Sequence, residues 1–374
     1  MKRRQVLVAG GAVVIAGAGA TYAGLRGMGS IEPYDDSVLV MRTALSQRLD
    51  TRDLIRFATL APSGHNTQPW RFRVGAKGLD ILPDLSRRTI VVDPDDHHLF
   101  VGLGCAGENL ALAAGASGRP GDLSFDAAEN GSVAFKFGDA PPTDPALFAA
   151  ISRRQSTRAD YDGAQVSVTD LAKLTEAAAV PGVDLVLITD RPRMERVREL
   201  VVAGNTAQMA DAAFVQELKA WLRFNPRAAI DTGDGLFSGS SGNPSIPTWL
   251  GPHLFDWTVS AASENDKYAR QLKSSAGIAV FVSHAADRDH WVRAGRACQR
   301  FALQATALGL KHAFINQPVE VPNLRPELAS LVGMPGRRPD IVMRFGYGPT
   351  LPFSARRPVS AVLVPGSDLY QTVG

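Results

Sequence analysis

The feature that most constrains the fold of this chain is an internal repeat of one long helical pattern. The stretches FVGLGCAGENLALAAGASG (100–118) and WVRAGRACQRFALQATALG (291–309) superimpose at an offset of 191 residues, and Gly104 falls on Gly295. Both have apolar residues at helical spacing, many small residues and a closing glycine suited to ending a helix. The repeat predicts two long, close-packed helices in equivalent positions of two homologous halves.

Shorter segments around the repeat have the periods of strands and helices. Because the strands are framed by helices and one pair forms a hairpin, we expect a mixed α+β layer fold with homologous halves at 31–145 and 146–374. The expected elements are a helical pair over 36–60, a hairpin of WRFRV and LDIL, a helix over 168–179, the strand VDLVLIT, a long helix over 192–222, and the strands GIAVFVS and DIVMRFGYG.

The glycines of the first repeat also match a nucleotide-binding pattern. Residues 102–107, GLGCAG, fit the GxGxxG motif of dinucleotide-binding loops. That motif requires a preceding strand, whereas DPDDHHLF is typical of a loop, and the repeated counterpart RAGRAC lacks the motif. We therefore interpret these glycines as helix-packing residues.

The amino terminus is typical of an export signal. Residues 1–30 contain the paired Arg3 and Arg4, a weakly apolar run rich in Ala and Gly, and small residues suited to cleavage. The paired arginines favour the twin-arginine route, so we expect an exported or periplasmic protein with no stable membrane span in the mature chain. An uncleaved membrane anchor and a cytoplasmic location are the alternatives.

Charge and cysteine content narrow the partners and the redox chemistry. The 40 Lys and Arg residues nearly balance the 37 Asp and Glu residues, so we expect no nucleic-acid binding. The two cysteines, Cys105 and Cys298, are too few for the disulfide framework of an exported protein. We expect both to be buried as small apolar residues.

A basic segment opens the second half. In AISRRQSTRADYDG (150–163), Arg154, Ser156 and Arg158 occupy alternate positions, which point to one side of an extended segment. Two guanidinium groups and a hydroxyl on one side can bind a phosphate dianion through charge-assisted hydrogen bonds. Solvated surface arginines are the alternative interpretation of the same pattern.

Two segments together resemble one flavoenzyme family. APSGHNTQPW (61–70) resembles the APSxxNxQPW signature of FMN-dependent nitroreductases, and RQSTR (154–158) resembles their RxSxR phosphate segment. The twin helices and the later SARRPV also match, and two halves in one chain resemble the Acg-like branch. The resemblance implies a nitroreductase-like fold in which the halves mimic the family's homodimer.

The family's homodimers build two FMN sites at the subunit interface. Here the first half carries only the first signature and the second half only the phosphate segment, which implies one composite FMN site per chain at the junction. The implied FMN contacts are Arg154, Ser156 and Arg357 (or Arg356) at the phosphate, Arg158 at the pyrimidine edge, Pro62, Ser63, Gly64, Asn66 and Gln68 at the ribityl chain and ring, and Ile315, Asn316 and Gln317 beside the ring.

A stretch rich in Gly, Ser and Pro interrupts the second half. TGDGLFSGSSGNPSIPTWLGPHLF (232–255) also carries four bulky apolar residues, which a pure linker would not need. We expect a lid over a pocket, covering about 225–260, or else a loop packed against the outside of the fold.

Other patterns carry less chemistry. DPDDHH (93–98) has the composition of a metal site, but adjacent His97 and His98 cannot easily face one ion, and a helix-opening loop uses acidic capping residues. We therefore expect no metal. Ser63 and Ser156 lie in no GxSxG motif, which argues against a serine hydrolase.

These observations predict an FMN-dependent oxidoreductase. Electrons would pass through the flavin N5 to an electron-poor small molecule, a nitroaromatic or a quinone, and no acid or base of the protein is obligatory. The donor would be NAD(P)H or, for an exported protein, a quinol or a redox protein. The alternative is a protein that stores or sequesters FMN in a closed pocket with little or no reductase activity.

Overall fold

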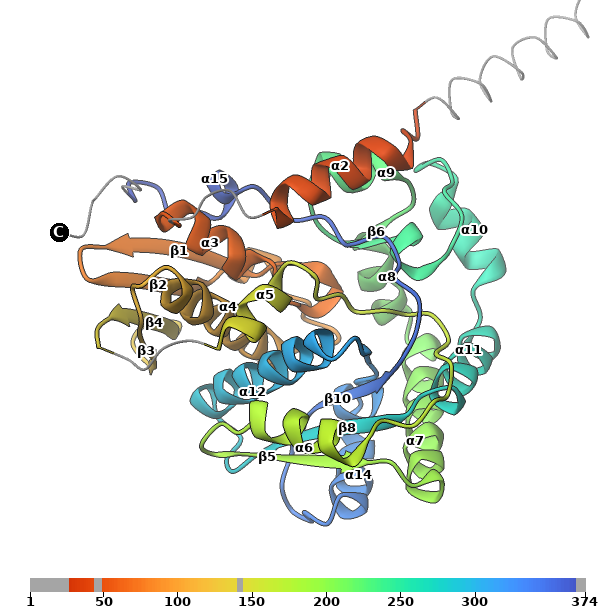
Figure 1. The fold of residues 1–374 in the computed structure, drawn as a ribbon. Helices are drawn as coiled ribbons and strands as arrows, with labels where there is room; N and C mark the ends of the chain where they lie inside the picture. Colours follow the sequence, from red (N-terminus) through yellow and green to blue (C-terminus); the bar gives the residue numbers. More distant parts are fainter. Residues whose placement is uncertain (1–26, 44–48, 140–143, 368–374) are drawn as a thin grey trace, which may run out of the picture.

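The computed structural model describes residues 27–43, 49–139 and 144–367. Within them, two four-stranded antiparallel sheets lie on either side of two long packed helices, α4 (His97–Ala116) and α12 (Arg288–Ala307) (Figure 1). The predicted mixed α+β fold with long packed helices is confirmed. Of the predicted export signal, residues 1–30, all but the last four lie outside the described residues.

The two sheets have the same topology, which extends the helical repeat to a whole unit. The strand orders are β1-β2-β4-β3 and β5-β8-β10-β9, and in both units the long helix connects the second strand to the third. The strands of the first sheet are β1 (Trp70–Gly75), β2 (Gly78–Pro83), β3 (Gly121–Asp126) and β4 (Ser132–Phe137); those of the second are β5 (Val183–Ile188), β8 (Gly277–Ser283), β9 (Lys311–Phe314) and β10 (Pro339–Gly346).

The two repeated helices touch at their glycines. A Cβ added to Gly104 would lie 2.0 Å from the carbonyl oxygen of Val292, and a Cβ added to Gly295 would lie 2.0 Å from that of Val101. Real Cβ atoms essentially never come closer than 3.0 Å to such neighbours. The GLGCAG glycines therefore lie within a helix, and at Gly104 the absent side chain allows α12 to approach.

Polar groups also join the two helices. Glu108 of α4 is buried and accepts hydrogen bonds from Arg296 and Arg300 of α12, at 2.9 and 2.8 Å. At the adjacent positions, Gln299 of α12 donates to Asn109 of α4 at 2.7 Å. Because each partner belongs to a different half, these bonds fix the register of the seam.

A large insertion distinguishes the second unit. Strands β1 and β2 form a tight hairpin, whereas the equivalent β5 and β8 are separated by residues 189–276, which include the predicted lid. The expected helix over 192–222 is wrong as a single element, because Asp211 ends one helix and caps the next by accepting from the backbone N–H of Ala213. The inserted elements are α7 (Arg191–Ala210), α8 (Ala212–Ala220), β6 (Leu222–Arg223), α9 (Pro226–Thr232), β7 (Leu236–Phe237), α10 (Gly251–Thr258) and α11 (Ala261–Lys273).

Sheet packing places the core in two parts. One face of the second sheet packs on α12, and its other face packs on α7 and on further helices, so β8 and β10 are buried along their whole length. The hairpin of β3 and β4 is an element that the expected strands omit. The remaining helices are α2 (Ile31–Arg42), α3 (Thr51–Thr59), α5 (Pro145–Ile151), α6 (Val168–Ala177), α13 (Gln317–Glu320), α14 (Arg325–Leu331) and α15 (Val359–Val362).

Among the described residues, one helix has the length and apolar composition to cross a membrane. This helix is α4, and 83% of its most apolar window is buried inside the protein. Its burial against the first sheet, α3 and α12 is that of a core helix. Cys105 of α4 and Cys298 of α12 are buried free thiols, as expected.

Candidate functional site

A cavity of about 650 Å³ lies at the junction of the two halves, and a smaller one of about 50 Å³ adjoins it. The larger volume is within the range of roughly 300–1,000 Å³ that is usual for cofactor and ligand sites. Both cavities are lined by the first-half loop, by the basic segment of the second half and by the lid. The residues that line both are Pro62, Ser63, Arg158, Leu236 and Phe314.

The smaller cavity collects four arginines. Arg154 and Arg158 come from the basic segment, Arg356 from near the carboxyl end, and Arg42 from the end of α2. All except the half-buried Arg158 are buried, and none of the four forms an ion pair with a carboxylate among the described residues. The pocket therefore concentrates positive charge that the protein itself does not neutralise.

Burial and mutual repulsion make these charges costly. Burial lowers the pKa of Arg154 to about 10, and burial together with the charge of Arg154 lowers the pKa of Arg356 to about 9. Burial, followed by the charges of Arg356 and Arg154, holds the pKa of Arg42 well below its usual value. An anion in this pocket would relieve both effects.

Several N–H groups in the cluster lack an acceptor. The Nε and Nη1 of Arg154 and the Nε of Arg42 are buried and have no hydrogen-bond partner in the described part of the chain. An unsatisfied buried donor of a charged group costs about 1–3 kcal/mol or more. A tetrahedral oxyanion, which offers several acceptor oxygens, fits this set of donors.

The carboxyl end of α3 holds two of the arginines in place. Arg356 donates to the carbonyl oxygens of Thr59 at 2.7 Å and Ala61 at 3.1 Å, and Arg154 donates to that of Leu60 at 3.2 Å. The last carbonyls of a helix lack intrahelical donors and carry partial negative charge. The helix end thereby fixes the guanidinium groups and leaves their remaining donors for a ligand.

The basic segment is extended, as its alternation predicts. Ser156 forms a bridge with His312 next to β9, and the backbone N–H of Thr157 donates to the His312 carbonyl at 2.8 Å. The buried Arg344 of β10 donates to the carbonyl oxygens of Thr157 and Ala159, at 3.1 and 2.8 Å. This geometry brings the side chains of Arg154, Ser156 and Arg158 to the smaller cavity.

The first-half loop is held in an unusual conformation. His65, Asn66 and Gln68 all have left-handed backbone angles, with φ of 47°, 54° and 52°. Such angles cost energy in non-glycine residues and persist only where the surroundings enforce them. Here the Ser63 Oγ accepts from the Gln68 N–H at 2.9 Å, and the Asn66 amide donates to the carbonyls of two distant segments, Gly235 at 3.0 Å and Ala355 at 3.2 Å.

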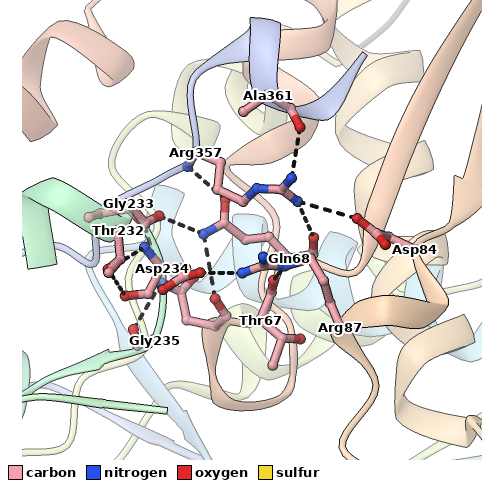
Figure 2. Close-up of polar contacts among 12 residues, drawn as sticks. Thr67, Gln68, Asp84, Arg87, Thr232, Gly233, Asp234, Gly235, Arg357 and Ala361 are labelled. Atoms are coloured by element: carbon pink, nitrogen blue, oxygen red, sulfur yellow. Dashed lines mark hydrogen bonds and ion pairs between the residues drawn. The ribbon is translucent and has the colours of Figure 1, made fainter. Parts of the chain in front are cut away.

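A clasp of polar contacts ties this loop to the lid and to the carboxyl-terminal segment (Figure 2). The Gln68 amide donates to the Gly233 carbonyl at 2.8 Å and accepts from the Arg357 backbone N–H at 2.9 Å. Arg87 donates to the Thr67 carbonyl at 2.5 Å and pairs with Asp234. These residues hold three chain segments together beside the cavity.

Three residues implied as FMN contacts take other roles. Gln68 and Arg357 belong to the clasp, where Arg357 also donates to the Ala361 carbonyl at 2.7 Å, and Ile315 packs in the hydrophobic core. None of the three lines either cavity, and their implied contacts with FMN stay predictions. The implied residues that do line a cavity are Pro62, Ser63, Gly64, Asn66, Arg154, Ser156, Arg158, Asn316, Gln317 and Arg356.

The lid forms one wall of the larger cavity rather than packing on the outside of the fold. Trp249 departs from this pattern, because 70% of its side chain is exposed. The apolar lid residues that face the cavity are Leu236, Phe237, Ile246, Leu254, Phe255 and Val259. Such a wall excludes water from whatever binds beneath it.

The histidines at the start of α4 are held by carboxylates. Asp93, His97 and His98 offer atoms within 4.8 Å of one another, a spacing compatible with a metal. Asp93, however, accepts the backbone N–H groups of His98 and Leu99 at 3.0 Å, and the His97 Nε2 lies 2.9 Å from Asp340. Helix capping and a buried His–Asp pair account for these residues, and we assign no metal here.

Some cavity residues have no signal in the sequence. Arg42 lies at the end of an ordinary helix, and Glu320 and Tyr268 belong to no recognised motif. They meet only because distant segments converge. The sequence indicates Arg42 only weakly, as an arginine near the end of a partly apolar helix.

Comparisons with known proteins point to one group of relatives. No family model matches the chain. It is 28% identical over 338 residues to a Mycobacterium tuberculosis protein named as an NAD(P)H nitroreductase, Rv3131. The alignment covers 86% of this chain and 93% of that protein. This chain is also 23% identical over 83% of its length to 94% of another M. tuberculosis protein of that designation, acg.

Solved structures resemble the chain more distantly. The FMN-dependent nitroreductase NfnB from Mycobacterium smegmatis, in complex with NADPH, is 13% identical over 61% of this chain and 96% of its own, with a TM-score of 0.37. A nitroreductase with bound FMN from Bacteroides fragilis is 18% identical over 55% of this chain and 90% of its own, with a TM-score of 0.35. Likenesses at this level place no ligand in the present cavity.

Proposed function

We propose that this chain is an FMN-dependent oxidoreductase of the nitroreductase type, with one composite site at the junction of its two halves. The observation that carries the proposal is the unneutralised arginine cluster, whose unpartnered N–H groups face a small cavity that opens beside a large one. A phosphate ester joined to a planar ring matches this pair of cavities. The relatives named as NAD(P)H nitroreductases support an oxidoreductase.

The residues fit FMN segment by segment. Arg42, Arg154, Ser156 and Arg356 would hold the phosphate, and the backbone around Ser63 would approach the ribityl chain. Arg158 lines both cavities and so can reach from the phosphate toward the ring. Bound FMN would supply hydride and electron transfer, and the protein would bind it, orient it and exclude water.

The donor and the acceptor are proposed by class. NAD(P)H is the donor that the relatives' names support, and the acceptor is a nitroaromatic or a quinone that enters beneath the apolar lid. If the amino-terminal segment directs export through the twin-arginine route, a quinol or a redox protein replaces NAD(P)H as donor. No observation favours FMN storage over turnover.

The test uses purified protein and its visible spectrum. We expect one FMN per chain, bleaching by NADPH or by dithionite, and rapid return of the absorbance when a naphthoquinone or a nitroaromatic is added. A flavin that dithionite reduces but no acceptor reoxidises would support storage instead. A protein that binds no FMN would overturn the proposal.

Arginine variants test the site itself. Arg154→Met removes the buried donors at nearly constant volume, and we expect FMN affinity to fall by roughly 100-fold, the equivalent of about 3 kcal/mol for charge-assisted hydrogen bonds. Arg154→Lys keeps the positive charge but not the planar, forked guanidinium group. Its affinity for FMN should lie between that of the unaltered protein and that of Arg154→Met. Arg196→Met, at an exposed ion pair, is the control and should bind FMN as the unaltered protein does.

A further inference from the structure

Two titratable side chains from different halves meet in the wall of the large cavity. His98 lies in the first turn of α4, and Glu320 is the last residue of α13. Both line the cavity, and α13 begins with Gln317, which lines it as well. Neither side chain lines the small cavity that holds the arginine cluster.

Glu320 is a carboxyl group without a basic partner. Its Oε2 accepts a hydrogen bond from the Gln208 Nε2 of α7 at 2.6 Å, and no Lys or Arg pairs with it among the described residues. The His98 Nε2 is buried and has no hydrogen-bond partner, and its Nδ1 lies 4.0 Å from Asp93. A carboxyl group and an imidazole with an unused nitrogen thus border the same space.

The surroundings favour a proton on Glu320 and disfavour one on His98. Burial raises the pKa of Glu320, and the charge of Asp93 adds to the effect, while His98 and the Gln208 hydrogen bond oppose it. Burial and the charge of His97 lower the pKa of His98, whereas Asp93 and Glu320 raise it.

Two further groups act on the pair from outside it. The charge of Arg338, in the segment that leads into β10, also lowers the pKa of His98. Tyr268 of α11 interacts with Glu320 and hydrogen-bonds with Gln317, and burial raises its pKa to about 12, so it stays neutral. The carboxyl group of Glu320, whose pKa burial raises, is therefore the candidate proton donor on this side of the cavity, and it shares this wall with the imidazole of His98.

Reduction of a quinone under the lid requires such a group. Transfer of a hydride to the quinone adds two electrons and one hydrogen, and leaves a hydroquinone anion until one proton binds its oxygen. The apolar lid makes an unneutralised anion costly in this cavity. A proton source in the wall lets the product form as a neutral hydroquinone.

We propose that Glu320 and His98 together donate the proton that completes acceptor reduction. This inference rests on the proposed oxidoreductase function. Bound FMN, once reduced, would supply the hydride. Glu320, with His98 in the same wall, would donate the proton to the acceptor oxygen, and water entering after product release would restore that proton. Gln208 positions the carboxyl group through its hydrogen bond.

The experiment separates proton transfer from electron transfer. The FMN-loaded protein is reduced with dithionite and mixed either with a naphthoquinone or with ferricyanide, which accepts electrons without protons. For Glu320→Gln we expect quinone reduction to slow by about 100-fold, in the range usual for the loss of a general acid, with ferricyanide reduction unchanged. Glu199→Gln, which alters an exposed glutamate that pairs with Arg196 and lines neither cavity, should keep both rates.

A second measurement does not depend on turnover. The titration of His98 is followed by NMR with ¹⁵N-labelled histidine, and the pKa of His98 should fall in Glu320→Gln because a neighbouring negative charge is removed. Equal slowing with both acceptors, unchanged quinone reduction, or an unchanged His98 titration would overturn the inference. If the unaltered protein reduces ferricyanide but no quinone or nitroaromatic, the proposed acceptor class fails, while the His98 titration still reports on the pair.

Discussion

The crossing of the two repeated helices offers the sharpest test of the fold. Gly104→Ala adds one methyl group at the point where α4 meets α12. That methyl group would lie 2.0 Å from the Val292 carbonyl oxygen and 3.0 Å from the Val292 Cα, which are backbone atoms and cannot turn aside. The helices would have to separate by about 1 Å to restore the 3.0 Å that real Cβ contacts respect.

The magnitude follows from two opposing effects. Alanine gains about 1 kcal/mol over glycine within a helix. Overpacking of a tight core costs about 1–3 kcal/mol and sometimes more, and a gap of 0.5–1 Å along the seam forfeits roughly a quarter to a half of each dispersion contact there. At a backbone-to-backbone crossing we take the upper part of that range, so the net loss is about 2 kcal/mol or more.

The assay is thermal unfolding followed by circular dichroism, with FMN fixed or absent. At an unfolding entropy of about 2.1 cal/mol/K per residue, a loss of about 2 kcal/mol lowers the midpoint by about 3 °C. Gly102→Ala is the matched control, because its new methyl group would meet Pro62 and Ser63 at 3.8 Å, an ordinary contact. This variant should be slightly more stable than the unaltered protein. A Gly104→Ala protein as stable as Gly102→Ala would refute the close crossing.

Three further predictions concern the site. Burial lowers the pKa of His65 to about 4, so between pH 6.5 and 4 the unfolded chain binds a proton that the folded chain does not bind. The free energy of unfolding should therefore fall by up to about 3 kcal/mol as the pH is lowered through that window. Urea unfolding of His65→Gln should lack most of this pH dependence. Inorganic phosphate should stabilise the FMN-free protein by about 1.4 kcal/mol at ten times its Kd, and a thermal shift in Arg154→Met as large as in the unaltered protein would contradict the anion pocket. Gln68→Ala leaves two buried backbone groups of the clasp unpaired, so we expect a loss of about 2–4 kcal/mol and faster FMN release in stopped-flow dilution; unchanged release would show that the clasp does not support the loop.

The elements that local sequence patterns predict are those whose burial has a simple period. The repeated helices appear in α4 and α12 because their apolar and small residues recur on each turn, and both glycines that follow them, Gly118 and Gly309, adopt left-handed angles with φ of 74° and 78°. Strand β8 reads as a nearly continuous apolar run because both of its faces are buried. Here the local pattern and the final environment agree.

The hairpin of β3 and β4 shows that a search for apolar runs misses some strands. In β3 the residues at Asp122, Ser124 and Asp126 are exposed and alternate with the partly buried Leu123 and Phe125. This is the period of an edge strand with one face in water, and it contains no apolar run. Strict alternation is therefore the signal by which the hairpin can be recognised.

The site is harder to predict because its contacts are non-local. Gln68 belongs to the family signature, yet its amide joins Gly233 and Arg357, which lie 165 and 289 residues away in the chain. Arg357 and Arg356 are neighbours in sequence, but only Arg356 turns toward the arginine cluster. A motif identifies the segment that reaches the cavity, and the packing of distant segments decides which side chains point into it.

The asymmetry of the two repeated units explains why one pocket is complete. The loop after α3 reaches both cavities, whereas the equivalent residues 178–182 after α6 line neither and lead directly into β5. Before α6 the chain places Arg154 and Arg158 in the pocket, and before α3 it contributes Arg42 to that same pocket rather than to a second one. An anion offsets the desolvation of the buried guanidinium groups in this pocket. Because the arginines of both units surround one pocket, one phosphate can serve them all, whereas two separate arginine sites would need two ligands. The insertion between β5 and β8 then supplies the single lid that this pocket requires.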